Sequence, residues 1–182
     1  MPALPGPGER GLSANGQTAA GVRLDVDGTG IATVDTGLPV LDRLIVRLAE
    51  VARFDLALEI QPGDAEAEVV AAGNALGDAL FAPLRAPGAR GHGSGALTSA
   101  EALAFVILEI SDPPLLVSNV DLTEARIGGL GTDVARSFLE RLAGAAGLVL
   151  HVRLLNGTES QHVLEAIFKA LGAALAQACA RG

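Results

Sequence analysis

The residues of this sequence that are best suited to bind a metal ion or to take part in catalysis are His162 and Glu165. Both fall in a segment of helical spacing near the C-terminus. Residues three apart on an α-helix share one face, so this imidazole and carboxylate could bind one metal ion together. Two ligands make only half of a metal site. A weak local pair between an exposed histidine and a helical glutamate explains the same spacing, and the two residues alone do not decide between these interpretations.

The other histidines and the single cysteine give weaker signals. His151 lies in the alternating segment 148–155, which is typical of a strand, so we interpret it as a residue on a sheet face. His92 lies in the glycine-rich segment 88–95, which could bind a phosphate through backbone amides. That segment lacks the strand-and-helix context of a nucleotide-binding loop, so we predict a flexible loop. Cys179 is predicted to be an inert residue of the last helix.

The composition restricts the class of protein. A chain of 182 residues that is 49% hydrophobic and 19% charged can bury a substantial core, which excludes disorder over most of its length. A net charge of −8 and the absence of Trp and Tyr oppose binding to nucleic acid. No apolar run has the length of a membrane span or signal peptide. We therefore predict a soluble, cytoplasmic protein with no membrane or nucleic-acid partner.

Hydrophobic periodicity predicts the elements that position these residues. Residues 1–20 are rich in proline and glycine and are expected to form a flexible tail. Alternation predicts three strands in the first half, at residues 22–26, 31–35 and 54–60. Helical spacing predicts two helices, at residues 41–52 and 71–84. The predicted order is therefore strand, strand, helix, strand and helix.

Two tripeptides recur in the second half of the chain in the same order. Arg47-Leu48-Ala49 returns as Arg141-Leu142-Ala143, an offset of 94 residues (141 − 47). Ala75-Leu76-Gly77 returns as Ala170-Leu171-Gly172, an offset of 95 residues (170 − 75). The difference of one residue corresponds to a single loop insertion, so the chain is interpreted as a duplicated unit.

The duplication predicts an α+β fold in which each unit is a small sheet with two helices. We expect one domain over residues 21–182, made of two pseudo-repeats of about 21–88 and 89–182. Corresponding helix positions should then superpose, with Arg43 over Ser137 and Val70 over Glu165.

The segment 157–169, with the sequence GTESQHVLEAIFK, resembles the second signature of the imidazoleglycerol-phosphate dehydratases of histidine biosynthesis. That signature is a glycine, a paired His-His, a glutamate three residues later and Ala-x-Phe-Lys. The segments 148–155, 41–42, 54–56 and 126–128 also match, so the resemblance covers about residues 21–178. It implies an internally duplicated fold of the ribosomal-protein-S5-domain-2-like type and a hydro-lyase activity. It also implies trimers that assemble into a 24-subunit shell, with paired manganese ions bound between subunits.

The first half departs from the family's ligand pattern at every position. Its helix histidine is replaced by Arg43, and the matching position of the second half is Ser137. The first His-His-x-x-Glu motif aligns with Glu66, Ala67 and Val70 in a shortened segment. An arginine at a cation site adds electrostatic repulsion.

The second half keeps only His162 and Glu165 of its motif, with Gln161 in place of the leading histidine. By this alignment, the sequence has two of the family's eight metal ligands. The Ser-Thr-Lys-Gly tail that helps family members bind phosphate is also absent, because the chain ends in Ala-Cys-Ala-Arg-Gly.

These departures predict a protein that keeps the fold but has lost the manganese and the lyase activity, and no cofactor is expected. One alternative is a working dehydratase with an altered site, in which Glu165 is catalytic together with His162 and Lys169. The other is a binding or scaffolding subunit. Arg90, Arg126 and Lys169 are the candidates for binding a phosphorylated small molecule. A trimer-based homo-oligomer that does not build the 24-subunit shell is expected.

Overall fold

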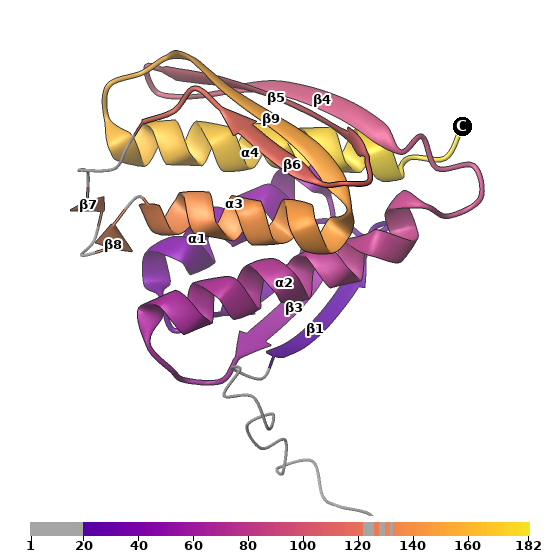
Figure 1. The fold of residues 1–182 in the computed structure, drawn as a ribbon, viewed down its shortest axis with the longest axis horizontal. Helices are drawn as coiled ribbons and strands as arrows, with labels where there is room; N and C mark the ends of the chain where they lie inside the picture. Colours follow the sequence, from indigo (N-terminus) through magenta and orange to yellow (C-terminus); the bar gives the residue numbers. More distant parts are fainter. Residues whose placement is uncertain (1–19, 122–125, 128–129, 132) are drawn as a thin grey trace, which may run out of the picture.

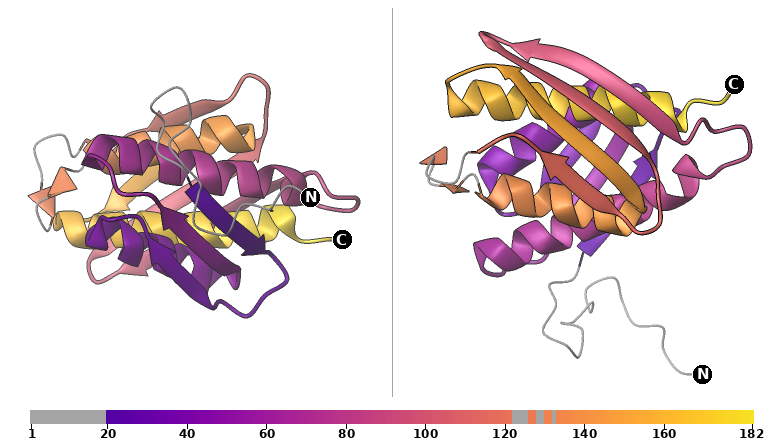
Figure 2. Two further views of the ribbon diagram at one scale, coloured as in Figure 1. Left: turned by 90° about the horizontal axis from the view of Figure 1, so that it is seen from below. Right: turned by 45° about the horizontal axis from the view of Figure 1, so that its top comes forward.

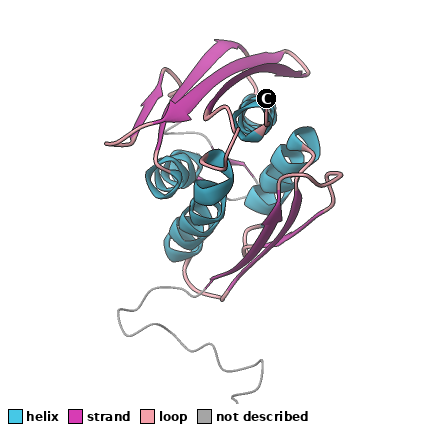
Figure 3. Ribbon diagram, turned by 90° about the vertical axis from the view of Figure 1, so that its right-hand side faces the viewer, coloured by secondary structure: helices cyan, strands magenta, loops and turns pink. Residues whose placement is uncertain are grey.

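The computed structural model describes residues 20–121, 126–127, 130–131 and 133–182. The described residues form two main β-sheets on the outside, with the α-helices between them (Figures 1 and 3). The expected flexible tail lies outside the described residues except for Ala20, which belongs to the first strand and not to a tail. The α+β class is confirmed.

The first half consists of β1 (Ala20–Asp25), β2 (Ala32–Asp35), α1 (Pro39–Ala52), β3 (Asp55–Ile60) and α2 (Ala65–Leu84). Its sheet has the order β1-β3-β2, with β1 antiparallel and β2 parallel to the central strand. The predicted order of elements is confirmed. The helix α2 begins six residues earlier than predicted, because the Asp64 carboxylate caps it by accepting the backbone N–H of Ala67 at 2.8 Å.

The second half consists of β4 (His92–Ser99), β5 (Ala102–Ile110), β6 (Leu115–Ser118), β7 (Arg126–Ile127), β8 (Leu130–Gly131), α3 (Asp133–Ala146), β9 (Leu148–Asn156) and α4 (Ser160–Cys179). The sheet order is β4-β5-β9-β6, and this sheet lies across α3 and α4 (Figure 2). In it β5 is antiparallel and β6 parallel to β9, while β7 and β8 pair separately. His151 lies on β9, as predicted for a residue of a sheet.

The second half repeats the topology of the first, with β5, β6, α3, β9 and α4 in the places of β1, β2, α1, β3 and α2. The ends of α1 and α3 are 94 residues apart (133 − 39 and 146 − 52), and those of α2 and α4 are 95 apart (160 − 65 and 179 − 84). Arg43 and Ser137 therefore hold the same position in their helices, as do Val70 and Glu165. Among the described residues of the first half, β4 has no counterpart.

The repeated tripeptides mark the places where helices of different halves cross. The helix α1 packs on α4, and α2 packs on α3. A Cβ atom at Gly172 would lie 2.4 Å from the carbonyl oxygen of Leu48, and one at Gly77 would lie 2.7 Å from that of Leu142. Glycine allows these backbones to approach closely. Each half therefore buries its helices against the other half, which makes the two units a single core.

The prediction of a flexible loop around His92 was wrong, because β4 begins at this residue. The two glycines that follow it lie against α4. A Cβ atom at Gly93 would lie 2.1 Å from the carbonyl oxygen of Ala174, and one at Gly95 would lie 2.4 Å from that of Ala170. The glycines thus serve close packing of a strand on a helix, and the sequence pattern of a mobile loop arose from that requirement.

Among the described helices, α4 is long and apolar enough to cross a membrane by length and composition. However, 67% of that window is buried inside the fold. The large side chains Phe168 and Leu171 are fully buried, and Phe168 stacks on Phe138 of α3 with ring centroids 5.5 Å apart. These contacts are those of a core helix.

Candidate functional site

His162 lies in the first turn of α4 and is held by a carboxylate from the turn between β4 and β5. Its Nδ1 is 2.7 Å from Oε2 of Glu101. The other carboxylate oxygen of Glu101 accepts the backbone N–H groups of Thr158 at 3.3 Å and Glu159 at 3.0 Å. These hydrogen bonds, led by that from Glu159, lower the pKa of Glu101 to about 2. The ionised carboxylate therefore fixes both the imidazole and the start of α4.

Glu165, one helical turn further along α4, faces a guanidinium of α1. Its Oε1 lies 3.8 Å from Nε of Arg47, whose Nη1 donates to Oε2 of Glu50 at 3.2 Å. Arg43 is exposed one turn earlier on α1. The two ligand-type residues that the sequence pointed to are thus engaged by different partners, one from the second sheet and one from the first helix.

The candidate residues for binding a phosphorylated molecule are not gathered at one place in the described chain. The Lys169 ammonium donates to the carbonyl oxygen of Thr98 on β4 at 2.8 Å. Arg90 lies at the opposite end of α4, where its backbone N–H donates to the carbonyl oxygen of Ala180 at 3.1 Å. A helix of 20 residues is about 30 Å long, so Arg90 is far from the first turn of α4. Arg126 begins β7, and its side chain lies outside the described part.

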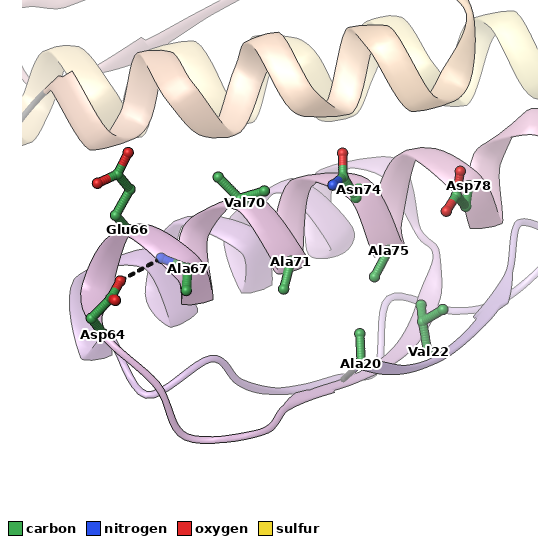
Figure 4. Close-up of a pocket in the computed structure, with 10 residues that line it drawn as sticks. All are labelled: Ala20, Val22, Asp64, Glu66, Ala67, Val70, Ala71, Asn74, Ala75 and Asp78. Carbon is green, nitrogen blue, oxygen red and sulfur yellow. Dashed lines mark hydrogen bonds between the residues drawn. The ribbon is translucent and has the colours of Figure 1, made fainter. Parts of the chain in front are cut away.

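A groove of about 510 Å³ runs along α2 beside β1. Its lining combines small apolar side chains with carboxylates and one amide: Ala20, Val22, Asp64, Glu66, Ala67, Val70, Ala71, Asn74, Ala75 and Asp78. In Figure 4 the alanines of α2 turn toward β1, whereas Glu66 and Asn74 point to the opposite side of the helix. The groove occupies the position of the first family signature, since Glu66, Ala67 and Val70 hold the places of the second signature's residues on α4.

Sequence reasoning missed two carboxylates that each accept several backbone N–H groups, Glu101 and Asp55. The Oδ1 atom of Asp55 accepts the backbone N–H groups of Thr29, Gly30 and Ile31 at 2.9, 3.1 and 3.0 Å. The pKa of Asp55 is lowered, chiefly by the hydrogen bond from Ile31. The turn sequence Asp-Gly-Thr-Gly was a local sign that loop amides need an acceptor, but nothing local could pair them with a residue of β3.

Comparison with known proteins places the chain in a family. The sequence profile of the family described as imidazoleglycerol-phosphate dehydratase matches residues 36–175. A curated imidazoleglycerol-phosphate dehydratase of Azoarcus sp. (strain BH72) is 36% identical over 170 residues, covering 91% of this chain and 87% of the relative. That of Exiguobacterium sp. (strain ATCC BAA-1283 / AT1b) is 32% identical over 166 residues, covering 89% and 85%. The chain belongs to the imidazoleglycerol-phosphate dehydratase family.

Two crystal structures of imidazoleglycerol-phosphate dehydratases share this fold. The Staphylococcus aureus (N315) enzyme matches with a TM-score of 0.82 at 24% identity, covering 90% of this chain and 94% of that one. The Pyrococcus furiosus enzyme, solved in complex with (S)-C348, matches with a TM-score of 0.81 at 23% identity and 91% coverage of both chains. These matches confirm the fold class that the resemblance implied.

The family resemblance implies manganese, and the donors of this dehydratase relative fit such an ion poorly. His162 is suitable by itself, because an Nδ1 bonded to a carboxylate is the usual arrangement of a histidine that binds a metal through Nε2. Glu165 instead compensates the charge of Arg47. Within the ranges that the structure describes, no three His, Cys, Asp or Glu side chains converge as a metal-holding group. One imidazole does not meet the ligand demand of a hard, six-coordinate cation.

Proposed function

We propose that this member of the dehydratase family is catalytically degenerate: it keeps the fold and lacks the manganese centre and the lyase activity. The observation that supports the proposal is the separate engagement of its two remaining ligand-type residues. His162 is bound by Glu101 and Glu165 by Arg47. Both contacts give these residues a structural use that requires no metal.

The chemistry of the reaction points the same way. Elimination of water from an unactivated carbon needs an acid, a base and an electron sink held together. Arg47 lies beside Glu165, so a divalent cation bound there would meet the positive charge of the guanidinium. At the first motif, Ala67 and Val70 carry no donor atoms.

A working dehydratase with an altered site is the second candidate, and one observation favours it. The Glu101–His162 pair holds an imidazole in the manner of a general base, with Nδ1 on a carboxylate and Nε2 available. In that case His162 accepts a proton from the substrate, and Glu165 and Lys169 assist the transfer. A binding or scaffolding subunit that takes a phosphorylated molecule remains the third.

Metal content and turnover measured on the same preparation separate these candidates. The purified chain is dialysed, assayed for manganese, and tested with imidazoleglycerol phosphate and added Mn²⁺ beside the Azoarcus relative as positive control. We expect far less than about one manganese per chain and no turnover, with no further change in His162→Ala. About one ion per chain that is lost in His162→Ala would overturn the proposal, and turnover would establish the altered enzyme.

We also propose a soluble, cytoplasmic, trimer-based homo-oligomer that does not depend on metal. An exposed apolar row on the second sheet supports the self-association, because Ile107 and Val117 pair with His151 from either side and are 44% and 38% exposed. Light scattering with and without EDTA tests the assembly. We expect a small oligomer of the 18.3 kDa chain whose size is the same with and without EDTA. A 24-subunit particle that dissociates in EDTA would contradict this.

A further inference from the structure

Strand β4 forms an open edge of the second sheet, because it pairs with β5 on one side only and runs along α4 (Figure 1). The β4–β5 hairpin closes at the pair Ser99 and Ala102, around a turn of two residues. The closing pair of such a turn is hydrogen-bonded, and bonded and non-bonded pairs alternate along an antiparallel ladder. The odd-numbered residues of β4 therefore bond to β5, and the even-numbered residues direct their backbone N–H and C=O groups to the open edge.

Two side chains of α4 reach this edge. Oε1 of Gln177 accepts the backbone N–H of Ser94 at 2.8 Å, and the ammonium of Lys169 donates to the carbonyl oxygen of Thr98 at 2.8 Å. The contacts are eight residues apart on the helix (177 − 169) and four apart on the strand (98 − 94), which are lengths of about 12 and 13 Å. The helix thus covers one backbone group at each end of the segment 94–98.

Between the two contacts the edge stays open at Ala96. Its backbone N–H and C=O point away from β5 and have no partner among the residues that the structure describes. Ala173 lies midway between Lys169 and Gln177 on α4, and its methyl group offers no donor or acceptor. Open N–H and C=O groups on an edge strand are a template for pairing with another chain.

The covered groups are the ones that a second copy of β4 would need. A twofold axis through Ala96 would pair this residue with itself and would pair Ser94 with Thr98 of the second copy. In that register the N–H of Ser94 donates to the carbonyl oxygen of Thr98, once on each side of the axis. Both partners of this inter-chain hydrogen bond are already bound by side chains of α4.

We propose that Lys169 and Gln177 keep the edge of β4 closed to β4 of a second copy, and that without them two chains join their second sheets into one. Covering an edge with polar side chains, lysine above all, is a known means of preventing such pairing. This edge is separate from the apolar row of Ile107, His151 and Val117, which lies on a face of the sheet. The inference does not depend on the proposed loss of activity.

A cysteine at the twofold position detects the pairing. In the inferred register, Ala96→Cys brings two Cα atoms to about 5.5 Å from each other, a separation that a disulfide spans. The matched control is Thr98→Cys, because Thr98 is also exposed and lies on the same face of β4. Its Cα atoms would be about 13 Å apart, too far for a disulfide. Native Cys179 does not compete, because burial raises its pKa to about 11.

Each cysteine is introduced into the full chain with and without Lys169→Met/Gln177→Leu, and the covalent dimer is quantified by mass spectrometry after equilibration in glutathione buffers. We expect the dimerisation constant of Ala96→Cys to increase at least about tenfold in the double variant, because two more inter-chain hydrogen bonds become possible. The constant of Thr98→Cys should not change. No increase, or an equal increase at both positions, would overturn the proposal.

Two further double variants control for the change in polarity. Gln61→Leu/Arg136→Met removes one amide and one positive charge from exposed positions outside α4 and β4, and it should leave the dimer fraction unchanged. Lys169→Arg/Gln177→Glu keeps a donor and an acceptor at the edge, and it should also leave the fraction unchanged. An increase in either control would contradict the assigned role of the two side chains.

Amide hydrogen exchange on the unaltered chain gives a readout that requires no substitution. The amide of Ser94 should exchange more slowly than that of Ala96, because only the first is bound by Gln177. Gln177→Leu should bring the two rates together. Equally slow exchange of both amides in the unaltered chain would mean that the edge is already paired, which would refute the inference.

Discussion

The helices α2 and α4 occupy equivalent positions in the two halves, yet they are anchored in different ways. The N-terminus of α2 is capped by its own Asp64, and the positions of the family motif on it carry no metal-binding side chain except Glu66. Glu159 at the N-cap of α4 makes no side-chain cap. That helix is tied to the β4–β5 hairpin through Glu101, with His162 bound to the same carboxylate.

The difference extends to the positions of the family motif on the two helices. His162, Glu165 and Lys169 each make a polar contact that links α4 to another element, respectively the β4–β5 turn, α1 and β4. The corresponding residues of α2, Ala67, Val70 and Asn74, line an open groove instead. Among these positions, those on α4 hold contacts between elements, whereas those on α2 face the groove.

The crossing glycines give the largest expected effect and test whether the two halves share one core. Gly172→Ala and Gly77→Ala should each lower the free energy of unfolding by about 2 to 3 kcal/mol, because the new Cβ meets a backbone carbonyl of the facing helix. Urea denaturation measures this. The control is Gly144→Ala in α3, where nothing lies within 4 Å, and it should be neutral or stabilising. If only one of the two substitutions lowered the free energy of unfolding, the two helix crossings would not be equivalent.

Acid pH tests the carboxylates that organise each half, Asp55 in the first and Glu101 in the second. The pKa of both is lowered in the folded protein, that of Glu101 from 4.5 to about 2. A lowered folded-state pKa stabilises the fold above the unfolded-state value and loses that stabilisation as the pH falls toward the folded-state value. Stability should therefore decline from about pH 5 to about pH 2.

Thermal unfolding followed over this pH range is the measurement. Glu101→Gln and Asp55→Asn should each lower the melting temperature at neutral pH and flatten the decline in acid. The matched control is Asp25→Asn, because exposed Asp25 accepts a single backbone N–H within the described residues, that of Asp27 at 2.9 Å. An unchanged acid profile in Glu101→Gln would mean that the cap of α4 contributes nothing to stability.

The difference between the helix caps predicts a smaller effect. Asp64→Ala should cost about 1 kcal/mol, because the backbone N–H of Ala67 loses its acceptor. Glu159→Ala should change the free energy of unfolding by less than about 0.5 kcal/mol, since this side chain caps nothing. Chemical denaturation of the two variants side by side would sharpen the comparison, and equal costs would refute it.

The smallest expected effect is that of the Arg47–Glu165 contact. Arg47 is half exposed and its Nε lies 3.8 Å from the carboxylate, so Arg47→Met should cost no more than about 0.5 kcal/mol. The same variant has a second use, because it removes the positive charge from Glu165. If Arg47→Met acquires manganese on dialysis against Mn²⁺ while the unaltered chain does not, the arginine itself keeps the cation out.

The sequence by itself determined the order of the elements in the first half, the repeated pattern and the family, and each rested on a local signal. Strand and helix periodicity depend on neighbours a few residues apart, so the elements of the first half were predictable. The repeat was visible because Leu48 and Gly172, like Leu142 and Gly77, must satisfy the same close crossing in both halves. The start of α2 was misplaced because alanine-rich turns carry no amphipathic pattern, and the cap at Asp64 decided it.

Only the tertiary structure decided the partners of the candidate site. Glu101 and His162 are 61 residues apart, and no local pattern encodes their hydrogen bond. The same is true of β4. Its glycine-rich sequence is typical of a loop, and only the structure shows that these glycines pack against α4. Residue types and short spacings fix what a side chain can do. Which group it meets is set by long-range packing of helices and sheets, because the energy of that contact depends on positions that the chain brings together only on folding.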